Sequence, residues 1–390
     1  MDKMIEPQTR PARATDAVHD VGPDALPDRT RPGRGAISNR TGRFERLRKN
    51  ATDDGWRQDH ADGDPAPRLD TIVTFDRTRS IIARNDSPDI PFDRSINAYR
   101  GCEHGCVYCY ARPTHAWLGL SPGLDFETRL FAKPNAAELL ARELARPGYK
   151  PRTIAIGTNT DPYQPVERRL KITRAILEVL AAHNHPVSIV TKSGLVARDL
   201  DILGPMAARG LAAIGVSLTT LDADLAANME PRAPRPERRL ETIRMLATAG
   251  LPVTVMAAPM IPALTDHELE AILIRARKAG ATHAGYILLR LPLELKELFE
   301  EWLATHYPDR KRRVLNRLRE MRGGALYRSQ FGERMHGRGD LAKLLEERFR
   351  IAARQQGFRT ERTLLDPHRF RLTETEATAR QLDLFDAAPA

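Results

Sequence analysis

The stretch "GCEHGCVYCY", residues 101–110, contains every cysteine of the chain, because Cys102, Cys106 and Cys109 are the only 3 cysteines among 390 residues. The first residues, "MDKMIEPQTRPARATD", lack the apolar core of a signal peptide, and no apolar run reaches the roughly 18 residues of a membrane helix. We therefore expect a cytoplasmic protein that contacts no membrane. In a reducing cytosol, an odd and clustered set of cysteines indicates a metal-binding or catalytic site and not a disulfide framework.

The number of thiols distinguishes two kinds of metal site. A structural zinc ion takes four protein ligands, and His104 is the only obvious local candidate for a fourth. An iron-sulfur cluster on three thiolates leaves one iron open to bind another molecule, which is typical of a reactive centre. The sequence therefore favours an iron-sulfur cluster on Cys102, Cys106 and Cys109, with structural zinc and three structural thiols as the alternatives.

Short β-branched runs alternate with amphipathic stretches from about Thr71 to Leu291. The runs predict six strands, at 95–99, 153–157, 187–191, 213–218, 253–256 and 286–291. Helices are expected between them, at about 135–145, 170–182, 198–209, 236–249 and 266–279. Thr265 and Glu268 form a predicted capping box at the start of the last helix. Alternating strands and helices imply a parallel sheet, and six units are too few to close a β/α barrel. We predict an α/β fold that is either an open partial barrel or a doubly wound sheet.

The chain divides into segments of different composition. Residues 1–69 are basic, rich in proline and poor in apolar residues, so we expect them to be mostly disordered. Within them, "GRGAISNRTGRFE" (33–45) is predicted to be a linker; the alternative is a segment that lies on the folded domain or on nucleic acid. We assign 70–295 to the barrel, 296–372 to a basic helical extension and 373–390 to a flexible tail.

The cysteine stretch follows the first predicted strand, "SINAY", and therefore lies in the first β-to-α loop, where β/α proteins place their chemistry. The pattern CxxxCxxC, with an aromatic residue before the last cysteine, resembles the radical SAM superfamily. Within it, "CVYCYARPTH" (106–115) resembles the branch related to spore photoproduct lyase and an uncharacterised bacterial family in that branch. The resemblance covers roughly residues 33–350.

This resemblance implies an open partial β/α barrel of about six units, one 4Fe-4S cluster on the three cysteines, and S-adenosyl-L-methionine bound at the open iron. Reductive cleavage of S-adenosylmethionine would give a 5'-deoxyadenosyl radical that abstracts hydrogen from a substrate. An electron donor such as flavodoxin or ferredoxin is the expected reductant.

The loop after the second strand, "GTNTDPYQPVER" (157–168), lies beside the cysteine loop and places Asn159, Thr160 and Asp161 where they can address an ammonium group. In the related enzymes this loop contacts the methionine amino group, a role that would fall to Thr160 and Asp161. A plain turn is the alternative for this composition.

Four further residues are assigned to the cofactor. Lys192, in "TKSG", matches a family lysine near the cofactor carboxylate and ribose, and Ser217 matches a serine that contacts the ribose. Glu230 and Arg232, in "NMEPRAPRP", are predicted to hold the cofactor carboxylate. Solvated side chains and an exposed loop are the alternatives.

Tyr108 and Tyr110 flank Cys109 and are expected near the cluster, with Tyr108 also assigned to the cofactor site. In the related enzymes, tyrosines here relay a hydrogen atom; the alternative is a hydrophobic lid that excludes water. Spore photoproduct lyase carries a cysteine hydrogen donor in the second-strand loop, and Thr158 stands at the equivalent place here. With no spare cysteine, we do not expect that cysteine-dependent reaction.

The net charge of +10 favours a polyanionic partner, with a merely soluble basic protein as the alternative. The stretch "RKRRVLNRLREMRGGALYR" (310–328) is strongly basic, and such a stripe attracts phosphates. A solvated basic helix is the alternative. The residues that we expect to bind nucleic acid are Arg310, Lys311, Arg312, Arg313, Arg317 and Arg319.

The tail ends in "QLDLFDAAPA", and "QLDLF" resembles the pentapeptide by which bacterial polymerases and repair proteins bind the DNA sliding clamp. The residues predicted to bind the clamp are Gln381, Leu382, Leu384 and Phe385. We therefore expect a radical SAM enzyme that acts on nucleic acid, DNA in the first place, in lesion repair. The alternatives are radical SAM modification of RNA or of a peptide, and a non-enzymatic, zinc-stabilised nucleic-acid-binding protein.

Overall fold

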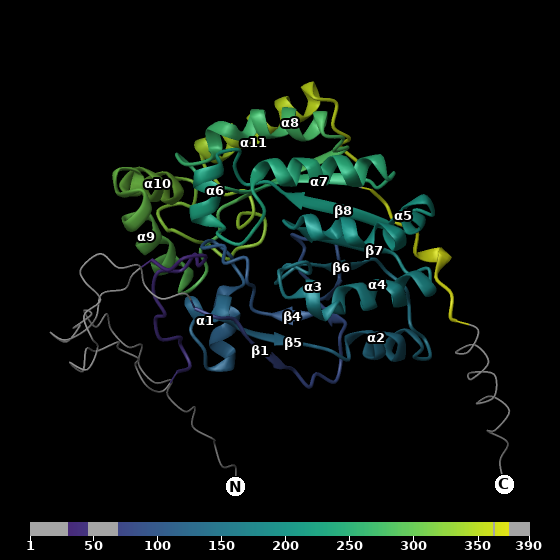
Figure 1. The fold of residues 1–390 in the computed structure, drawn as a ribbon. Coiled ribbons are helices and arrows are strands. Elements are labelled where there is room, and N and C mark those ends of the chain that lie inside the picture. Colours follow the sequence, from purple (N-terminus) through teal and green to yellow (C-terminus); the bar gives the residue numbers. More distant parts are fainter. Residues whose placement is uncertain (1–29, 46–68, 362, 374–390) are drawn as a thin grey trace, which may run out of the picture.

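A computed structural model describes residues 30–45, 69–361 and 363–373 (Figure 1). Its main sheet has the strand order β10-β9-β8-β7-β6-β3-β2, in which all neighbours are parallel except the edge pair β3 and β2. The strands of this sheet are β2 (Ala83–Arg84), β3 (Arg94–Ile96), β6 (Ile154–Ile156), β7 (Val187–Thr191), β8 (Ala212–Ser217), β9 (Val253–Met260) and β10 (His283–Leu288).

The strand order decides between the two predicted architectures. From β3 to β10 the order across the sheet follows the order along the chain. A doubly wound sheet would reverse direction at a switch point, and this one does not. Within the described ranges no ladder joins β10 to β2, so the sheet does not close on itself. The open partial barrel is confirmed, and the doubly wound alternative is wrong.

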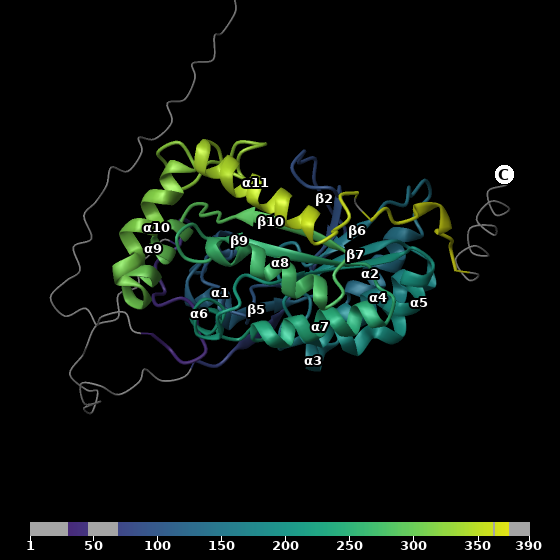
Figure 2. The same ribbon diagram turned by 90° about the horizontal axis from the view of Figure 1, so that it is seen from above.

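Helices follow the strands and cover one face of the sheet, as Figure 2 shows most plainly for α2, α4, α5 and α7. Their bounds are α2 (Ala136–Leu144), α4 (Ile172–Ala182), α5 (Leu200–Ala208), α7 (Pro236–Thr248) and α8 (Leu269–Lys278). Burial alternates along β7, where Val187 and Ile189 are fully buried and Val190 is exposed. This period of two shows that one face of the sheet packs on helices and the other faces a partly open interior.

Shorter helices lie in the connections, at η1 (Arg112–Leu118), α1 (Leu124–Thr128), α3 (Glu167–Leu170), η2 (Gly194–Asp199), α6 (Ala223–Met229) and η3 (Asp266–Glu268). The predicted capping box at Thr265 is wrong. The Thr265 hydroxyl accepts a hydrogen bond from the Ile261 N–H, while the Glu268 carboxylate binds the Thr220 hydroxyl and the Leu221 N–H. Glu268 therefore ties this turn to the loop after β8.

The first predicted strand, 95–99, is divided between two sheets. Its first part is β3, and Tyr99 and Arg100 form β4, which pairs with β5 (Arg129–Ala132). A three-stranded sheet results, in the order β1-β5-β4, with β1 at Ile72–Phe75. The chain changes sheets at Asn97, whose side chain instead binds the loop after β6.

Residues 33–45, which we call the strap, lie on the folded domain. Ala36 and Ile37 are buried, and the Ser38 hydroxyl donates a 2.8 Å hydrogen bond to Glu301 in α9. Arg43 also forms a 2.8 Å ion pair with Glu294. The prediction that this segment is a linker is therefore wrong, because two apolar side chains and several polar contacts anchor it.

The extension after the barrel consists of α9 (Leu295–His306), α10 (Pro308–Glu320), α11 (Asp340–Gln355) and η4 (Pro367–Arg369). Its buried side chains, including Trp302 and Leu318, belong to the same apolar cluster as the barrel core. The extension thus packs on the barrel. None of the helices in the described ranges combines the length and the apolar composition that crossing a membrane requires.

Candidate functional site

The three cysteines lie on the loop between β4 and η1. Gly105 adopts a left-handed φ of 67°, and a side chain there would collide with the Glu127 carboxylate. The Cys102 N–H donates to the Phe126 carbonyl at 2.9 Å, and the Cys109 N–H donates to the Cys106 carbonyl at 3.2 Å. Local turns and a contact to α1 thus help to fix this loop.

A buried arginine holds the cysteine loop through hydrogen bonds to its carbonyls. Arg112 donates hydrogen bonds to the carbonyls of Gly105 (3.1 Å) and Cys106 (2.9 Å), and its guanidinium pairs with Glu127. Glu127 also accepts the backbone N–H groups of Gly35 (3.0 Å) and Ala36 (2.8 Å) in the strap. Sequence reasoning missed this buried pair, which joins the cysteine loop, α1 and the strap.

The environment of the thiols bears on what they can hold. Burial, with the nearby Lys192 ammonium opposing it, raises the pKa of Cys106 to about 12, and burial also raises the pKa of Cys102. Such thiols are deprotonated when they bind a metal, and the ligands of iron-sulfur clusters are cysteine thiolates. In the described part of the chain, no three His, Cys, Asp or Glu side chains converge on a single-ion site. An iron-sulfur cluster is larger than a single ion and would be held by the three cysteine thiolates without their meeting at one point, so the donor set fits a cluster.

The loop after β6 approaches the cysteine loop through Asn97. The Asn97 side chain bonds to the Thr158 hydroxyl at 3.1 Å and accepts the Asn159 N–H at 3.0 Å. Thr160 is buried and its hydroxyl donates to the Tyr99 carbonyl at 3.2 Å, whereas Asn159 is exposed. The predicted trio therefore lies beside the cysteine loop, with Thr160 buried, Asp161 half-buried and Asn159 exposed.

Asp161 is used inside the protein. Its carboxylate accepts the Thr191 hydroxyl (2.7 Å), the Lys192 N–H (2.8 Å) and the Tyr163 N–H (2.9 Å), and lies 3.3 Å from the His104 Nδ1 atom. Burial acts to raise the pKa of Asp161, but the charge and contact of His104 and these hydrogen bonds outweigh it and hold the pKa well below its usual range. A contact between Asp161 and the methionine amino group stays a prediction.

Glu230 is also internally bonded. It accepts the Tyr108 hydroxyl and the Thr219 hydroxyl, the latter at 2.9 Å, and pairs with the buried Arg239. Arg239 in turn donates to the Ser217 carbonyl at 3.1 Å. This cluster fixes Tyr108 next to the cysteines, and no sequence pattern had pointed to Thr219 or Arg239.

Lys192 differs from these carboxylates because its ammonium has no ion pair or hydrogen bond among the described residues. Its Nζ atom lies 5.7 Å from the centre of the Tyr108 ring. Arg232 lies 3.1 Å from Glu103 and borders a cavity of about 260 Å³ between the strap and residues 231–232. Ser217 is buried, and its hydroxyl donates to the Ala258 carbonyl at 3.0 Å.

The two tyrosines beside Cys109 occupy different environments. The Tyr108 side chain is buried on Glu230, whereas Tyr110 is 42% exposed. The Tyr110 hydroxyl donates to the Thr158 carbonyl, and the guanidinium of Arg290 lies 4.6 Å from the centre of its ring. Of the two tyrosines, Tyr110 is thus the one that reaches solvent.

The predicted nucleic-acid residues lie on α10, where Val314, Leu315 and Leu318 are buried and the opposite side faces solvent. Arg317 pairs with Glu320 at 3.2 Å, and Arg319 bonds to Asn316 at 3.4 Å. The residues that make no ion pair with any described residue are Arg310, Lys311, Arg312 and Arg313. "QLDLF", with Gln381, Leu382, Leu384 and Phe385, lies outside the described residues.

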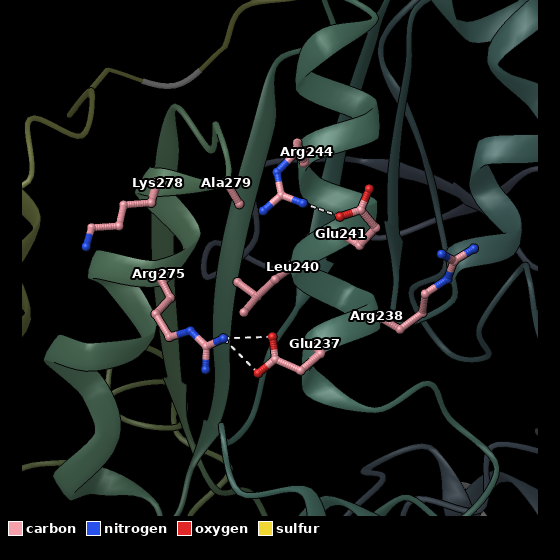
Figure 3. A pocket seen from close by; sticks show the side chains of 8 residues that line it. All are labelled: Glu237, Arg238, Leu240, Glu241, Arg244, Arg275, Lys278 and Ala279. Carbon is pink, nitrogen blue, oxygen red and sulfur yellow. Dashed lines mark hydrogen bonds and ion pairs between the residues drawn. The ribbon is translucent and has the colours of Figure 1, made fainter.

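A groove of about 620 Å³ lies elsewhere, on the outer side of α7 and α8 (Figure 3). Arg275 reaches across it to both oxygens of Glu237 at 2.7 Å, and Arg244 pairs with Glu241. None of the cysteines or predicted cofactor residues lines it. This groove is therefore separate from the predicted cofactor site.

Comparison with known proteins identifies the family. A family model described as the radical SAM superfamily matches residues 96–276, from β3 into α8. The chain belongs to this superfamily. An uncharacterized protein of Mycobacterium tuberculosis is 39% identical to this radical SAM chain over 280 residues, which cover 69% of the chain and 81% of the relative. An uncharacterized protein of Methanocaldococcus jannaschii is 28% identical over 214 residues, covering 55% of the chain and 76% of the relative.

Solved structures of spore photoproduct lyase share the fold of this radical SAM chain. One, complexed with dinucleoside spore photoproduct, has a TM-score of 0.52 and 18% identity, covering 73% of this chain and 80% of that chain. Another, with bound AdoMet and dinucleoside spore photoproduct, has a TM-score of 0.52 and 18% identity, covering 74% and 82%.

Membership of the superfamily makes this chain a radical SAM enzyme, and the non-enzymatic, zinc-stabilised alternative is wrong. The family implies a 4Fe-4S cluster and S-adenosylmethionine. The residues that would hold the cluster are Cys102 and Cys106, which are buried, and Cys109, which is half-buried.

Proposed function

We propose that this radical SAM enzyme acts on nucleic acid, with DNA as its substrate and lesion repair as its role. The observation that carries the proposal is the cationic side of α10. Arg310, Lys311, Arg312 and Arg313 make no ion pair among the described residues, and Arg310, Arg312 and Arg313 are exposed. Four such charges on one helix attract a polyanion, which surface cations paired with carboxylates do much less.

A chain of hydrogen bonds connects α10 to the cysteine loop. The Val107 N–H in that loop donates to the Met229 carbonyl at the end of α6, at 3.0 Å. The adjacent Asn228 bonds to α9 and the residue after it, through the Trp302 indole (3.1 Å) and the Tyr307 hydroxyl (3.2 Å). α10 begins at the next residue, and Figure 1 shows α9 and α10 at the same end of the sheet as α6 and α1. A polyanion on α10 would thus lie at the reactive end of the barrel.

The protein's own residues would prepare the reaction. When bound, the cluster and S-adenosylmethionine supply one-electron chemistry that abstracts a hydrogen atom from the substrate. Lys192, whose ammonium near Cys106 has no partner among the described residues, would bind the cofactor carboxylate, and Thr160 would help to orient the amino group. Burial of Cys102 and Cys106 would keep water from these two thiols.

Tyr110 would relay the hydrogen atom. Its hydroxyl donates to the carbonyl of Thr158, the residue that we expect at the place of the cysteine donor of spore photoproduct lyase. The Tyr108 hydroxyl donates to the buried Glu230 carboxylate, so Tyr108 would act from within this group of buried side chains.

Two further features favour DNA. The solved structures with the same fold are named as complexes with dinucleoside spore photoproduct, and a dinucleoside has the chemistry of nucleic acid. The tail sequence "QLDLF" resembles clamp-binding peptides, so we propose the DNA sliding clamp as a partner. Flavodoxin or ferredoxin would deliver the electron.

The test compares wild-type protein with a triple variant of α10, Arg310→Gln, Arg312→Gln and Arg313→Gln. Binding of a labelled single-stranded oligodeoxynucleotide is followed by fluorescence anisotropy across a salt series. We expect the slope of log affinity against log salt to fall by about 0.7 for each phosphate that the variant no longer neutralises. The matched control replaces Arg142, Arg244 and Arg275, which are each paired with a glutamate on the outer helices, by glutamine.

If both triple variants lose affinity equally, α10 is a solvated basic helix and not the nucleic-acid-binding surface. Tighter binding of the same sequence as RNA, or of an acidic peptide, would replace DNA by one of the other two substrates. The clamp is tested separately, by pull-down with full-length protein and with Leu384→Ala and Phe385→Ala, which should no longer bind it.

A further inference from the structure

Arg290 follows β10 at the end of the barrel that carries the cysteines, and its surroundings are unusual for a half-buried cation. Its Nε atom is buried and has no hydrogen-bond partner among the described residues. Its Nη1 atom bonds only to the Met335 sulfur, at 3.7 Å, and a thioether is a weak acceptor. In the described ranges no carboxylate lies within ion-pair distance of it. A charge held out of water without a counterion costs free energy, which a bound anion would offset.

Two neighbouring arginines show that this part of the chain is able to satisfy a guanidinium. Arg322 is buried and donates to several carbonyls, among them Leu289 at 2.7 Å. Arg334 lies 2.5 Å from the Asp89 carboxylate and also bonds to Ser87. Arg290 bonds to Met335, the residue that follows Arg334, yet has neither kind of partner in the part of the chain that the structure describes. Among these three arginines, only Arg290 is left without an oxygen acceptor.

The guanidinium of Arg290 is placed beside the reactive end of the protein. It lies 4.6 Å from the centre of the Tyr110 ring, and Tyr110 follows the cluster ligand Cys109 directly. The Tyr110 hydroxyl in turn bonds to the Thr158 carbonyl. An anionic group bound by Arg290 would thus sit next to the exposed face of Tyr110.

The segment after α10 forms the other part of the site around Arg290. It runs from the end of β10 to the far edge of the open sheet. The Met335 carbonyl accepts the Leu288 N–H at 2.8 Å, and the Gly332 N–H donates to Asp89, between β2 and β3, at 2.8 Å. Phe331 on this segment is 57% exposed, with the Arg334 guanidinium 4.8 Å from its ring centre. An exposed ring held by an arginine offers a surface on which a base can stack.

We propose that Arg290 binds a backbone phosphate of the substrate next to the nucleotide that reacts, and that the exposed ring of Phe331 stacks on a neighbouring base. This assignment rests on the proposed nucleic-acid substrate and names where on the protein that substrate is held. A guanidinium suits a phosphate because its planar N–H groups match two phosphate oxygens at once.

The experiment uses full-length, cluster-reconstituted protein under anaerobic conditions, with a labelled twelve-residue oligothymidylate as one probe and a glutamate-rich peptide as the other. The variants are Arg290→Gln, Arg290→Lys and Phe331→Ala; the control is Arg244→Gln, which removes the same charge from the outer face of α7. We expect Arg290→Gln to weaken oligothymidylate binding about tenfold and to lower its salt slope by the amount due to about one phosphate. Arg290→Lys should recover part of the affinity and most of the slope, and Phe331→Ala should weaken binding without changing the slope. Iron content and circular dichroism establish that each variant is folded.

The outcomes separate this assignment from the proposed function. If wild-type protein binds the oligonucleotide and Arg290→Gln binds it as well as Arg244→Gln does, the role of Arg290 is refuted while the nucleic-acid substrate stands. If the peptide binds in place of the oligonucleotide, or neither binds, both proposals are overturned. If Arg290→Gln does not fold, the Arg290→Lys variant decides. Reduced affinity at an unchanged salt slope would still identify a phosphate that is held by the planar guanidinium. Unchanged affinity would refute the role of Arg290.

Discussion

The strap can be separated from the cysteine loop by a single added carbon atom. A Cβ at position 35 would lie 1.9 Å from the Gly105 carbonyl oxygen, whereas ordinary contact begins at 3.4 Å. In Gly35→Ala the two segments must therefore move apart by about 1.5 Å. That movement breaks the hydrogen bonds from the Gly35 and Ala36 N–H groups to Glu127, now 3.0 and 2.8 Å long.

A hydrogen bond to a charged group contributes about 1.5–3 kcal/mol, so breaking two should lower the free energy of opening the strap by about 3 kcal/mol or more. Since 1.4 kcal/mol is a factor of ten, backbone amides at residues 33–38 should exchange hydrogen roughly a hundredfold faster. Hydrogen-exchange mass spectrometry of peptides covering the strap measures this directly. Bound iron should also be lost faster to a chelator, because the strap covers Gly105 and its neighbours.

The matched control is Gly204→Ala in α5, where an added Cβ meets nothing within 4 Å. Its strap should exchange as in wild type, and its global stability should change by no more than about 1 kcal/mol. The reasoning is refuted if Gly35→Ala leaves both strap exchange and iron loss at their wild-type values. Faster exchange in both variants would show that the effect is global and not local to the strap.

Three further predictions concern the site and the core. Cys106→Ala should lose bound iron and the low-temperature EPR signal of the reduced cluster, and an iron content equal to wild type would contradict its role as a ligand. Lys192→Met should weaken S-adenosylmethionine binding about tenfold in equilibrium dialysis with iron content unchanged, and Lys192→Arg should lose less affinity. Burial lowers the pKa of His185 to about 4, so the unfolded chain binds that proton more tightly. The contribution of neutral His185 to the free energy of unfolding is therefore fully present above about pH 6.5. It decreases by up to about 3 kcal/mol as the pH falls towards 4. In urea titrations, the difference between wild type and His185→Gln should shrink over that range.

The barrel strands could be predicted because their signal is local. β7 covers the predicted 187–191, and β8 begins one residue before the predicted 213 and ends one before 218. Each is a β-branched run whose burial follows from its own composition. The small sheet could not be predicted in the same way, because β4 has 2 residues and exists only through its pairing with β5.

The cysteine loop could be predicted as well, since three thiols at fixed spacing have few structural uses. The residues that support it could not. Arginine and glutamate are both common in surface helices. Only the tertiary fold shows that Arg112 and Glu127 are buried and paired. The strap was misassigned for a related reason, because 33–45 has few apolar residues and its attachment depends on the Glu127 carboxylate and on contacts to α9.

The charged residues near the cysteines divide by whether their hydrogen-bonding capacity is already used. Sequence reasoning assigned Asp161, Glu230, Lys192 and Arg232 alike to the zwitterionic end of the cofactor. In the structure, the carboxylates of Asp161 and Glu230 already accept hydrogen bonds from groups of the protein, and Arg232 forms an ion pair with Glu103. Among the described residues, Lys192 keeps an unpaired ammonium near Cys106, just as Arg290 keeps an unpaired guanidinium over Tyr110. Two cations without an ion pair in the described ranges therefore lie beside the tyrosines that flank Cys109, Lys192 at Tyr108 and Arg290 at Tyr110. We expect the first to bind the cofactor carboxylate and the second the substrate phosphate, because a charge without an internal partner is the one available to a ligand.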